Sequence, residues 1–333
     1  MADYDYHLPQ EAIATAPSEP RSAARLMVFE REAERLTHAI VRDLCDFVPR
    51  DYGFIFNNTR VFKARLFGVK TSGGRIEALI TRDTPAGILA QIRGRTHIGT
   101  TIAFGKNLRA EVLSFGKSAD RYLKFFENGA VIGFDRLAQI AETIGVVPLP
   151  PYIRRSAQSE DEERYQSRFA RVLGSAAAPT ASLHFDDELL AKVRSSYEWA
   201  EITLHIGLGT FKAVESADIR DHAMHSERFE LSDAAARLID SDRRLIAIGT
   251  SACRSAEHYA RAKQLSGECD LFLRPDNPPR RVNALMTNFH LPKSTLIMLI
   301  AAMLGTKRVK WLYNEAIAKG YRFYSYGDAM LIL

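Results

Sequence analysis

The feature that most constrains the fold of this chain is a change in hydrophobic periodicity along its 333 residues. From residue 54 to about residue 134, short runs alternate apolar and polar side chains and are separated by glycine turns. The runs 65–70 and 75–80 flank Ser72-Gly73-Gly74, a pattern that predicts a β-hairpin. Closely spaced strands without intervening helices predict a small β-barrel or a β-sandwich. Further strands are predicted at 88–93, 100–104, 109–115 and 122–126.

From residue 137 onward, helix and strand patterns alternate, which predicts an α/β layered domain. Strands are predicted at 201–206, 244–248, 271–273 and 282–287, and helices at 186–195, 232–241, 251–265, 295–304 and 310–319. A further short helix is predicted at 38–47. Residues 150–171, rich in charge, are interpreted as a solvated, mobile connection, with a substrate-ordered flap as the alternative.

Composition and charge exclude several classes of protein. The chain is 46% hydrophobic with a net charge of +5, which is typical of a globular protein and too small an excess for a dedicated nucleic-acid coat. Its most apolar stretch, 296–304, falls short of the ~20 residues that a membrane span needs. Without a leader pattern at the start, we expect a cytoplasmic protein. Three cysteines, at 45, 253 and 269, have no metal-binding spacing, so we expect reduced thiols and no metal site.

The common nucleotide and hydrolase motifs are missing. Gly207-Leu208-Gly209 lacks the third glycine of a dinucleotide fingerprint, and the chain has no His-Glu-x-x-His or Gly-x-Ser-x-Gly run. His222 and His225 lie three apart, but such a pair more often caps or packs than binds metal. The usual ATPase, dehydrogenase, zinc-hydrolase and serine-hydrolase interpretations therefore lose most of their support.

Dense polar segments follow the predicted strands instead. They lie at 56–60, 178–185, 203–211, 249–254 and 287–292. In an α/β sheet, ligands bind beyond the carboxyl ends of the strands, where helix N-termini offer free N–H groups. The segments therefore predict one convergent site, although each alone is also consistent with a capped turn.

The same segments resemble a known family. Ala-Pro-Thr-Ala-x-Leu-His-Phe at 178–185 and Thr-Asn-Phe-His-Leu-Pro at 287–292 are similar to specific motifs of the S-adenosylmethionine:tRNA ribosyltransferase-isomerases of queuosine synthesis. The resemblance runs nearly end to end, through 6–9, 57–68, 148–153, 203–211, 222–227 and 321–330. The chain departs from the family pattern at Ser182, Ala252 and Asp276.

The resemblance implies both fold and reaction. It implies an α/β main domain (α+β overall) formed by residues 1–53 and 137–333, with a small antiparallel β-barrel inserted at 54–136. It implies that the ribosyl part of S-adenosylmethionine, a co-substrate rather than a bound cofactor, moves onto 7-aminomethyl-7-deazaguanine at the wobble position of a tRNA. Adenine and methionine leave, and the sugar is rebuilt as an epoxycyclopentanediol in epoxyqueuosine.

The chemistry of that reaction suggests roles for residues in the matched motifs. The carbon beside the sulfonium must lose a proton, for which a histidine is the usual base. We expect His184 or His205 to be this base, with His225 and His290 positioning substrate groups; each could instead be structural. Asp328 is expected to accept a proton or to hold the amine, with a turn cap as the alternative.

Substrate-binding roles are expected for neutral amides, a hydroxyl and arginines. Arg254 suits the methionine carboxylate or a tRNA phosphate, with surface pairing as the alternative. Neutral hydrogen bonds to adenine, ribose or deazaguanine are expected from Asn57, Asn58, Thr180 and Asn288.

The implied tRNA anticodon arm needs phosphate contacts and stacking surfaces. Candidate phosphate contacts are Arg60, Lys63, Arg65, Arg154, Arg155, Arg280, Arg281, Lys293, Lys307, Arg308 and Lys310. Candidate stacking residues are Tyr152, Phe211 and Tyr326. We expect a monomer or a weak dimer.

Two alternatives remain open at this point. A family relative could move the same ribosyl group to another acceptor, as the three departures suggest. A catalytically inactive tRNA-binding module would bind tRNA in a salt-dependent way without turnover.

Overall fold

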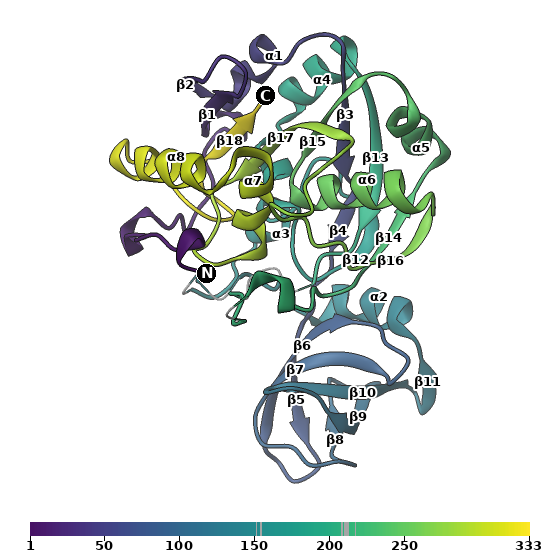
Figure 1. Ribbon diagram of the computed structural model, residues 1–333. Helices are drawn as coiled ribbons and strands as arrows, with labels where there is room; N and C mark the ends of the chain where they lie inside the picture. The colour runs from purple at the N-terminus through teal and green to yellow at the C-terminus, as the bar shows by residue number, and fades with distance from the viewer. Residues whose placement is uncertain (151, 154, 208, 210–212, 217) are drawn as a thin grey trace.

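The computed structural model describes residues 1–333 except 151, 154, 208, 210–212 and 217, and contains a large mixed sheet above a small barrel (Figure 1). The strands of the large sheet are β1 (Arg25–Glu30), β2 (Arg35–Ile40), β3 (Tyr52–Asn57), β13 (Glu198–Leu204), β14 (Glu227–Leu231), β15 (Arg244–Ile248), β16 (Ser266–Cys269), β17 (Val282–Asn288) and β18 (Ala329–Ile332). Within the described residues, these nine strands follow the order β16-β14-β13-β3-β15-β17-β18-β1-β2.

Four neighbouring strands in the middle of the sheet run parallel. β13 pairs with β3, β3 with β15, and β15 with β17, all in parallel register. Their carboxyl ends therefore meet at one edge of the sheet, which is where a ligand site is expected in an α/β domain.

Helices cover both faces of this sheet. They are α1 (Leu44–Phe47), α4 (Asp187–Ser196), α5 (Asp233–Asp240), α6 (Thr250–Ala262), α7 (Thr295–Leu304) and α8 (Thr306–Ala318). Successive side chains of a strand point to opposite faces, so Phe54 and Phe56 of β3 pack in the core beneath α1 and α4 while Ile55 packs beneath α5 and α6. Burial on both faces explains why β3 reads as a continuous apolar run.

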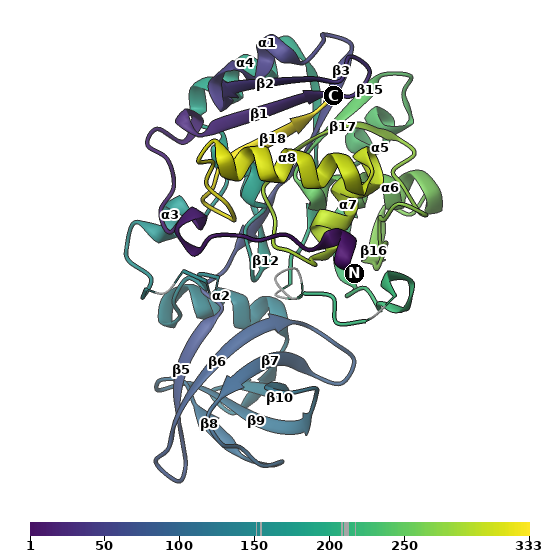
Figure 2. The ribbon, with the colours of Figure 1, turned by 60° about the vertical axis from the view of Figure 1, so that its left-hand side comes forward.

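The barrel is a separate sheet that closes on itself (Figure 2). Its strands are β5 (Arg65–Lys70), β6 (Arg75–Arg82), β7 (Ile88–Arg93), β8 (Thr101–Ala103), β9 (Leu108–Phe115) and β10 (Asp120–Glu127), and the pairing of β9 with β10 completes the closure. A short strand, β11 (Ala130–Ile132), pairs with β10. Helix α2 (Phe134–Ile144) packs Leu137, Ala138 and Ala141 into the barrel core.

The structure confirms the predicted fold class, an α/β main domain with a small antiparallel barrel. The first strands of the barrel lie near the predicted boundary of the inserted domain. Residues 52–57 form a central strand of the large sheet, and the barrel strands begin at Arg65. Because α2 contributes to the barrel core, we propose that the inserted domain spans about 65–144 rather than 54–136.

Several local predictions were wrong. Residues 38–47 do not form one helix: His38 to Ile40 end β2, Val41–Asp43 is a short 3-10 helix, and the α-helix is only Leu44–Phe47. Residues 271–273 are not a strand, since the strand there is Ser266–Cys269. In each case the observed strand forms because it pairs with another strand of the sheet. Hydrophobic periodicity does not reveal such pairing.

The connection between barrel and sheet is packed rather than solvated. It contains α3 (Asp161–Arg164) and β12 (Val172–Ser175), which pairs with β4 (Thr59–Val61). Tyr165 and Phe169 are fully buried, and the Asp161 carboxylate accepts hydrogen bonds from Arg155 and from the Gln158 N–H. The interpretation of 150–171 as a solvated segment is therefore wrong for its buried residues, such as Tyr165 and Phe169, whereas residues 158–160, 162 and 163 are exposed.

None of the helices in the described part of the chain is long and apolar enough to cross a membrane. The three cysteines are buried free thiols.

Candidate active site

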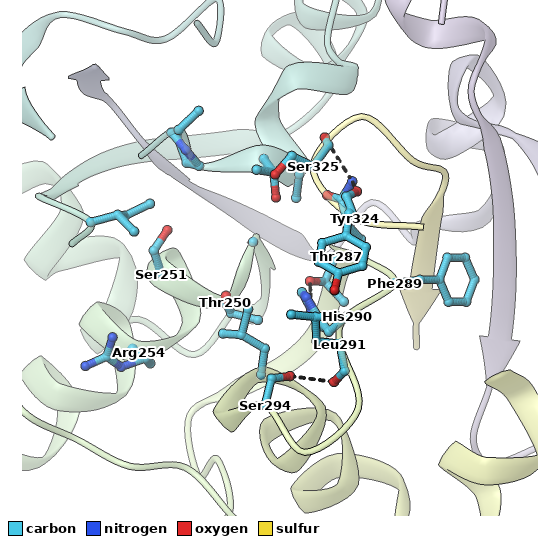
Figure 3. Close-up of a pocket in the computed structure, with 18 of the residues that line it drawn as sticks. Thr250, Ser251, Arg254, Thr287, Phe289, His290, Leu291, Ser294, Tyr324 and Ser325 are labelled. Carbon is cyan, nitrogen blue, oxygen red and sulfur yellow. Dashed lines mark hydrogen bonds between the residues drawn. The ribbon is translucent and has the colours of Figure 1, made fainter. Parts of the chain in front are cut away.

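A cavity lies at the carboxyl ends of β15 and β17. Four of the five polar segments predicted to converge contribute to its walls, through 178–181, Ile206, 249–254 and 287–291. We refer to it as the first cavity. Figure 3 shows Thr250, Ser251 and Arg254 on one side of it and Thr287, His290 and Tyr324 on the other.

Two helices begin at the first cavity. Gly249 adopts a φ of 91° that turns the chain from β15 into α6, and Thr250 and Ser251 then line the cavity with the first turn of that helix. Ser294, which also lines the cavity, caps α7 by accepting a hydrogen bond from the Ile297 N–H at 3.3 Å. Helix N-termini favour an anionic group, such as a carboxylate.

Asn57 organises the floor behind the first cavity. Its Nδ2 donates to the Leu204 carbonyl and to Ser251 Oγ, each at 3.0 Å, and its Oδ1 accepts from the Thr59 and Leu204 N–H groups at 3.1 Å. All four hydrogen-bonding positions of the amide are used, and the side chain is fully buried. Asn57, which was predicted to contact the substrate, therefore connects β3, β13 and α6 through its hydrogen bonds.

Asn288 joins the first cavity to the C-terminal turn. Its Nδ2 donates to the Tyr324 carbonyl at 2.9 Å, whereas its buried Oδ1 has no hydrogen-bond partner among the described residues. Tyr324 has a φ of 74°, an uncommon conformation that this hydrogen bond helps to hold. The ring of Tyr152, a predicted stacking residue, packs against that of Tyr324 with centroids 4.1 Å apart.

The guanidinium of Arg254 is hydrogen-bonded to groups within the protein. It donates to the Glu227 carboxylate, to the Leu271 carbonyl at 3.1 Å and to the Cys269 carbonyl at 3.0 Å. Both side chains of the Arg254–Glu227 pair are only 6% exposed. The alternative considered for Arg254, an ion pair at the protein surface, is therefore wrong, because the pair is buried beside the first cavity.

His290 lines the first cavity as a neutral imidazole. Its Nε2 lies 2.8 Å from Thr287 Oγ1, and burial lowers the pKa of His290 to about 3. At neutral pH this ring carries no charge and is positioned by Thr287.

His184 lies behind the wall that Thr180 and Asn288 present to the cavity. Burial lowers the pKa of His184 to about 4, although Asp328 and the side chain of Asn288 act to raise it. Its Nε2 has no hydrogen-bond partner among the described residues, and neither has the Oγ of nearby Ser182. Unpartnered buried polar atoms in a native protein call for an explanation, and a ligand is one.

His205 lines a second cavity, which lies between the sheet and the barrel. Residues 81–85 of the barrel, Gly174, His205 and Arg228 contribute to its walls. His205 Nδ1 lies 2.8 Å from Thr59 Oγ1, and burial lowers the pKa of His205 to about 4. The carboxylate of Glu227 is shared by both cavities, which therefore adjoin.

Other predicted site residues lie elsewhere. Asp328 is buried and accepts hydrogen bonds from the Arg25 and Arg322 N–H groups at 3.0 and 2.8 Å, the turn-capping geometry named as the alternative. Tyr326 donates to Asp161 at 3.3 Å, and His225 is exposed beside Gly209. Phe211 lies outside the described residues.

Asn58 and Arg60 are also engaged within the protein. Asn58 Oδ1 accepts from Thr203 Oγ1 at 2.7 Å, and its Nδ2 donates to Glu201 at 3.2 Å. Arg60 is exposed and pairs with Glu142 at 2.7 Å, at the junction of β4 with α2.

The predicted phosphate-binding residues are spread over several surfaces. Lys63 pairs with Glu162 at 2.7 Å, and Lys293 with Asp5 at 2.8 Å. Arg281, which directly precedes β17, donates to the Ser241 and Arg243 carbonyls before β15, at the opposite edge of the sheet from the first cavity. These residues do not form one face, which weakens their assignment as a joint tRNA contact; Arg154 lies outside the described residues.

The prediction missed Glu227 as a site residue. It belongs to the segment 222–227, but its role depends on β14 running antiparallel to β13, which brings it to the Gly207 N–H at 2.9 Å and to Arg254. Among the described residues, no group of three or more His, Cys, Asp or Glu side chains is arranged to hold a metal ion.

Comparison with known proteins agrees with this arrangement. A family model described as queuosine biosynthesis protein matches residues 1–332. The S-adenosylmethionine:tRNA ribosyltransferase-isomerase of a Nitratiruptor species is 48% identical over 331 residues, covering 99% of this chain and 97% of the relative. That of Sulfurimonas denitrificans is 47% identical, covering 100% and 98%. The crystal structure of S-adenosylmethionine tRNA ribosyltransferase from Thermotoga maritima is 30% identical and matches with a TM-score of 0.55, over 99% of this chain and 100% of that one. The chain therefore belongs to the queuosine biosynthesis family of tRNA ribosyltransferase-isomerases, and is an enzyme of that family.

Proposed function

We propose that the chain moves and isomerises the ribosyl moiety of S-adenosylmethionine onto 7-aminomethyl-7-deazaguanine at the tRNA wobble position, giving epoxyqueuosine. Adenine and methionine are released. The observation that carries this proposal is the pair of adjoining cavities that share Glu227. Two substrates that react with each other must bind in two subsites that adjoin.

The first cavity suits S-adenosylmethionine. The N-termini of α6 and α7 favour its carboxylate, and the amide of Asn288 lies in the cavity wall, within reach of ribose or adenine. Thr180 supplies a hydroxyl on the same wall. S-adenosylmethionine is a co-substrate in this scheme, and no step needs a metal ion.

The second cavity suits the deazaguanine of the anticodon loop. It opens between the barrel and the sheet, where a splayed-out base can enter, as single-stranded RNA loops are commonly recognised. The incoming amine must be neutral to attack. His205, held in its neutral form and positioned by Thr59, is the imidazole there that can accept a proton, beside the carboxylates of the same lining.

His184 is the base proposed for the carbon beside the sulfonium. Its buried ring is neutral at pH 7, the form that a base needs, and its side-chain contact with Asn288 links it to the wall of the first cavity. His290 and Thr287 position the substrate from the side of the cavity that also carries Tyr324. Arg254 and Glu227 shape the shared boundary rather than bind the methionine carboxylate directly.

The departures at Ala252 and Asp276 do not alter the acceptor side. Ala252 lies on the buried face of α6, and Asp276 pairs with Arg274 at 2.7 Å on an exposed turn. A substrate tRNA makes the cytoplasm the proposed location of the reaction.

Mass spectrometry of an anticodon stem-loop that carries the aminomethyl base, incubated with S-adenosylmethionine, tests the proposal. We expect the RNA to gain the rearranged sugar as adenine appears. Adenine release without a change in the RNA would indicate another acceptor, and neither change would indicate a binding module.

A further inference from the structure

The net positive charge of the chain comes from the barrel strands and their loops. Residues 65–132 hold 11 Lys and Arg against 5 Asp and Glu, a net +6, whereas the rest of the chain holds 34 against 35, a net −1. The modest +5 of the whole chain therefore conceals a strongly basic small domain attached to a nearly neutral body.

Within the barrel, basic residues gather at one end. The loops β5–β6, β7–β8 and β9–β10 carry Lys70, Arg75, Arg93, Arg95, Lys117 and Arg121, a set that we call the distal rim. The loops are joined to one another: Lys70 Nζ donates to the Arg95 carbonyl at 2.9 Å, and Arg121 Nε donates to Thr96 Oγ1 at 3.2 Å. The acidic side chains beside them are Glu77, which pairs with Arg65 and more loosely with Arg93 at 3.5 Å, and Asp120.

The distal rim also exposes apolar side chains. Ile98 is 66% exposed and Phe115 is 48% exposed, and Arg121 lies over the Phe115 ring at 4.3 Å. Cations interleaved with exposed rings are typical of surfaces that bind nucleic acid, where phosphates pair with the cations and bases stack on the rings.

The position of the rim indicates how long its ligand must be. Residues 81–85 line the second cavity at the near end of the barrel, and the three loops lie at the opposite end, away from the large sheet (Figures 1 and 2). Strands of 6–8 residues, such as β5 and β6, span roughly 20–25 Å at about 3.3 Å per residue. A molecule that reaches both places must be a macromolecule.

We propose that the distal rim binds the phosphate backbone of the tRNA at a distance from the wobble base, so that the barrel anchors the tRNA while the cavities act on one nucleotide. This inference rests on the proposed function, which supplies the nucleobase in the second cavity. Charge complementarity favours tRNA over other occupants, because the basic surface and the base-sized cavity belong to opposite ends of one small domain.

The test compares two full-length triple variants. The rim variant is Arg93→Gln/Arg95→Gln/Lys117→Gln, and all three side chains are exposed on loops. The matched control, Arg42→Gln/Arg237→Gln/Lys319→Gln, removes two arginines and one lysine that are exposed on the main domain. Fluorescence anisotropy measures the Kd of a full-length tRNA transcript between 50 and 200 mM KCl.

We expect the rim variant to bind tRNA about tenfold more weakly at 0.1 M salt, with the slope of log K against log salt reduced by about two to three. The control should match the wild type. At saturating stem-loop, the rate constant for ribosyl transfer should stay within about twofold of the wild type, since the rim does not touch the reacting atoms.

Wild-type affinity in the rim variant, or equal loss in both variants, would overturn the assignment. Loss of binding to vesicles rich in phosphatidylserine, with tRNA affinity unchanged, would assign the rim to a membrane and overturn it as well. Absence of transfer by the wild type, with rim-dependent tRNA binding intact, would instead reject the proposed function and leave the rim assignment standing.

Discussion

Arg254 of α6 and Glu227 of β14 form a buried ion pair at the boundary between the two cavities, with both side chains only 6% exposed. The pair connects the helix that begins at the first cavity to the strand that borders the second. Glu227 also accepts a hydrogen bond from the Gly207 N–H at 2.9 Å, so its carboxylate fixes the chain that follows β13.

We expect Glu227→Gln to destabilise the protein by about 3–5 kcal/mol, because it leaves the Arg254 charge buried without its counter-ion. Urea unfolding measures the change. Glu198→Gln is the control: its pair with Arg243 is about half exposed, at 51% and 44%, and exposed pairs contribute about 0–1 kcal/mol. Equal effects of the two substitutions would show that burial does not strengthen the Glu227 contact.

The buried histidines predict a loss of stability in mild acid. Burial lowers the pKa of His184 to about 4 and that of His290 to about 3, below the value near 6.5 of an unfolded chain. The unfolded state therefore takes up protons first as the pH falls below about 6.5, and at pH 5 each ring costs about 2 kcal/mol of folding free energy.

The substitution His290→Gln should remove the part of the pH dependence of stability that His290 contributes. The difference in unfolding free energy between pH 7.5 and pH 5 should be about 2 kcal/mol smaller in this variant than in the wild type. An identical difference would mean that the His290 ring is already protonated in the folded protein.

His184→Ala is expected to slow adenine release about 10²–10⁴-fold, the usual contribution of a general base. His205→Ala should reduce ribosyl transfer to the stem-loop more than it reduces adenine release, because His205 lies in the second cavity. The exposed His7 provides a control, since His7→Ala should leave both rates unchanged. Wild-type rates in both the His184→Ala and the His205→Ala variants would rule out these histidines as proton acceptors.

Gly174→Ala should displace His205, which lies beside it in the wall of the second cavity. Gly174 has a φ of 151°, and a Cβ there would lie 2.8 Å from the His205 ring, which would be pushed away from Thr59. We expect a slower transfer rate with tRNA affinity kept. Gly305→Ala is the matched control, because that glycine has a φ of 80° but no atom within 4 Å of an added Cβ. If the two variants lose transfer equally, backbone strain rather than His205 explains the effect.

Local elements of the fold were predictable where side-chain periodicity decides them. The predicted helix 295–304 and strands 88–93 and 244–248 coincide with α7, β7 and β15. In α7, Ser294 caps the start and Gly305 ends the helix, and both are visible in the sequence. The hairpin of β1 and β2 was missed because its second strand is only partly buried and shows little alternation between buried and exposed side chains.

The candidate site was predictable in outline. Segments that follow parallel strands must converge, and the residues 178–181, 249–254 and 287–291 do so. Individual roles were not predictable, because they depend on long-range contacts. Asn57 is saturated by Leu204 and Ser251, Asp328 caps a turn, and Glu227 reaches Arg254 only through the pairing of β14.

The central claim is that the ribosyl group, rather than the methyl or the methionyl group of S-adenosylmethionine, reaches the RNA. The most direct measurement uses two preparations of S-adenosylmethionine, one labelled with ¹⁴C in the ribose and one in the methyl group, each incubated with the stem-loop that carries the aminomethyl base. We predict that label from the ribose enters the RNA in proportion to the adenine released, and that label from the methyl group stays with methionine. Methyl label in the RNA, or adenine release without ribose label in the RNA, would contradict the account.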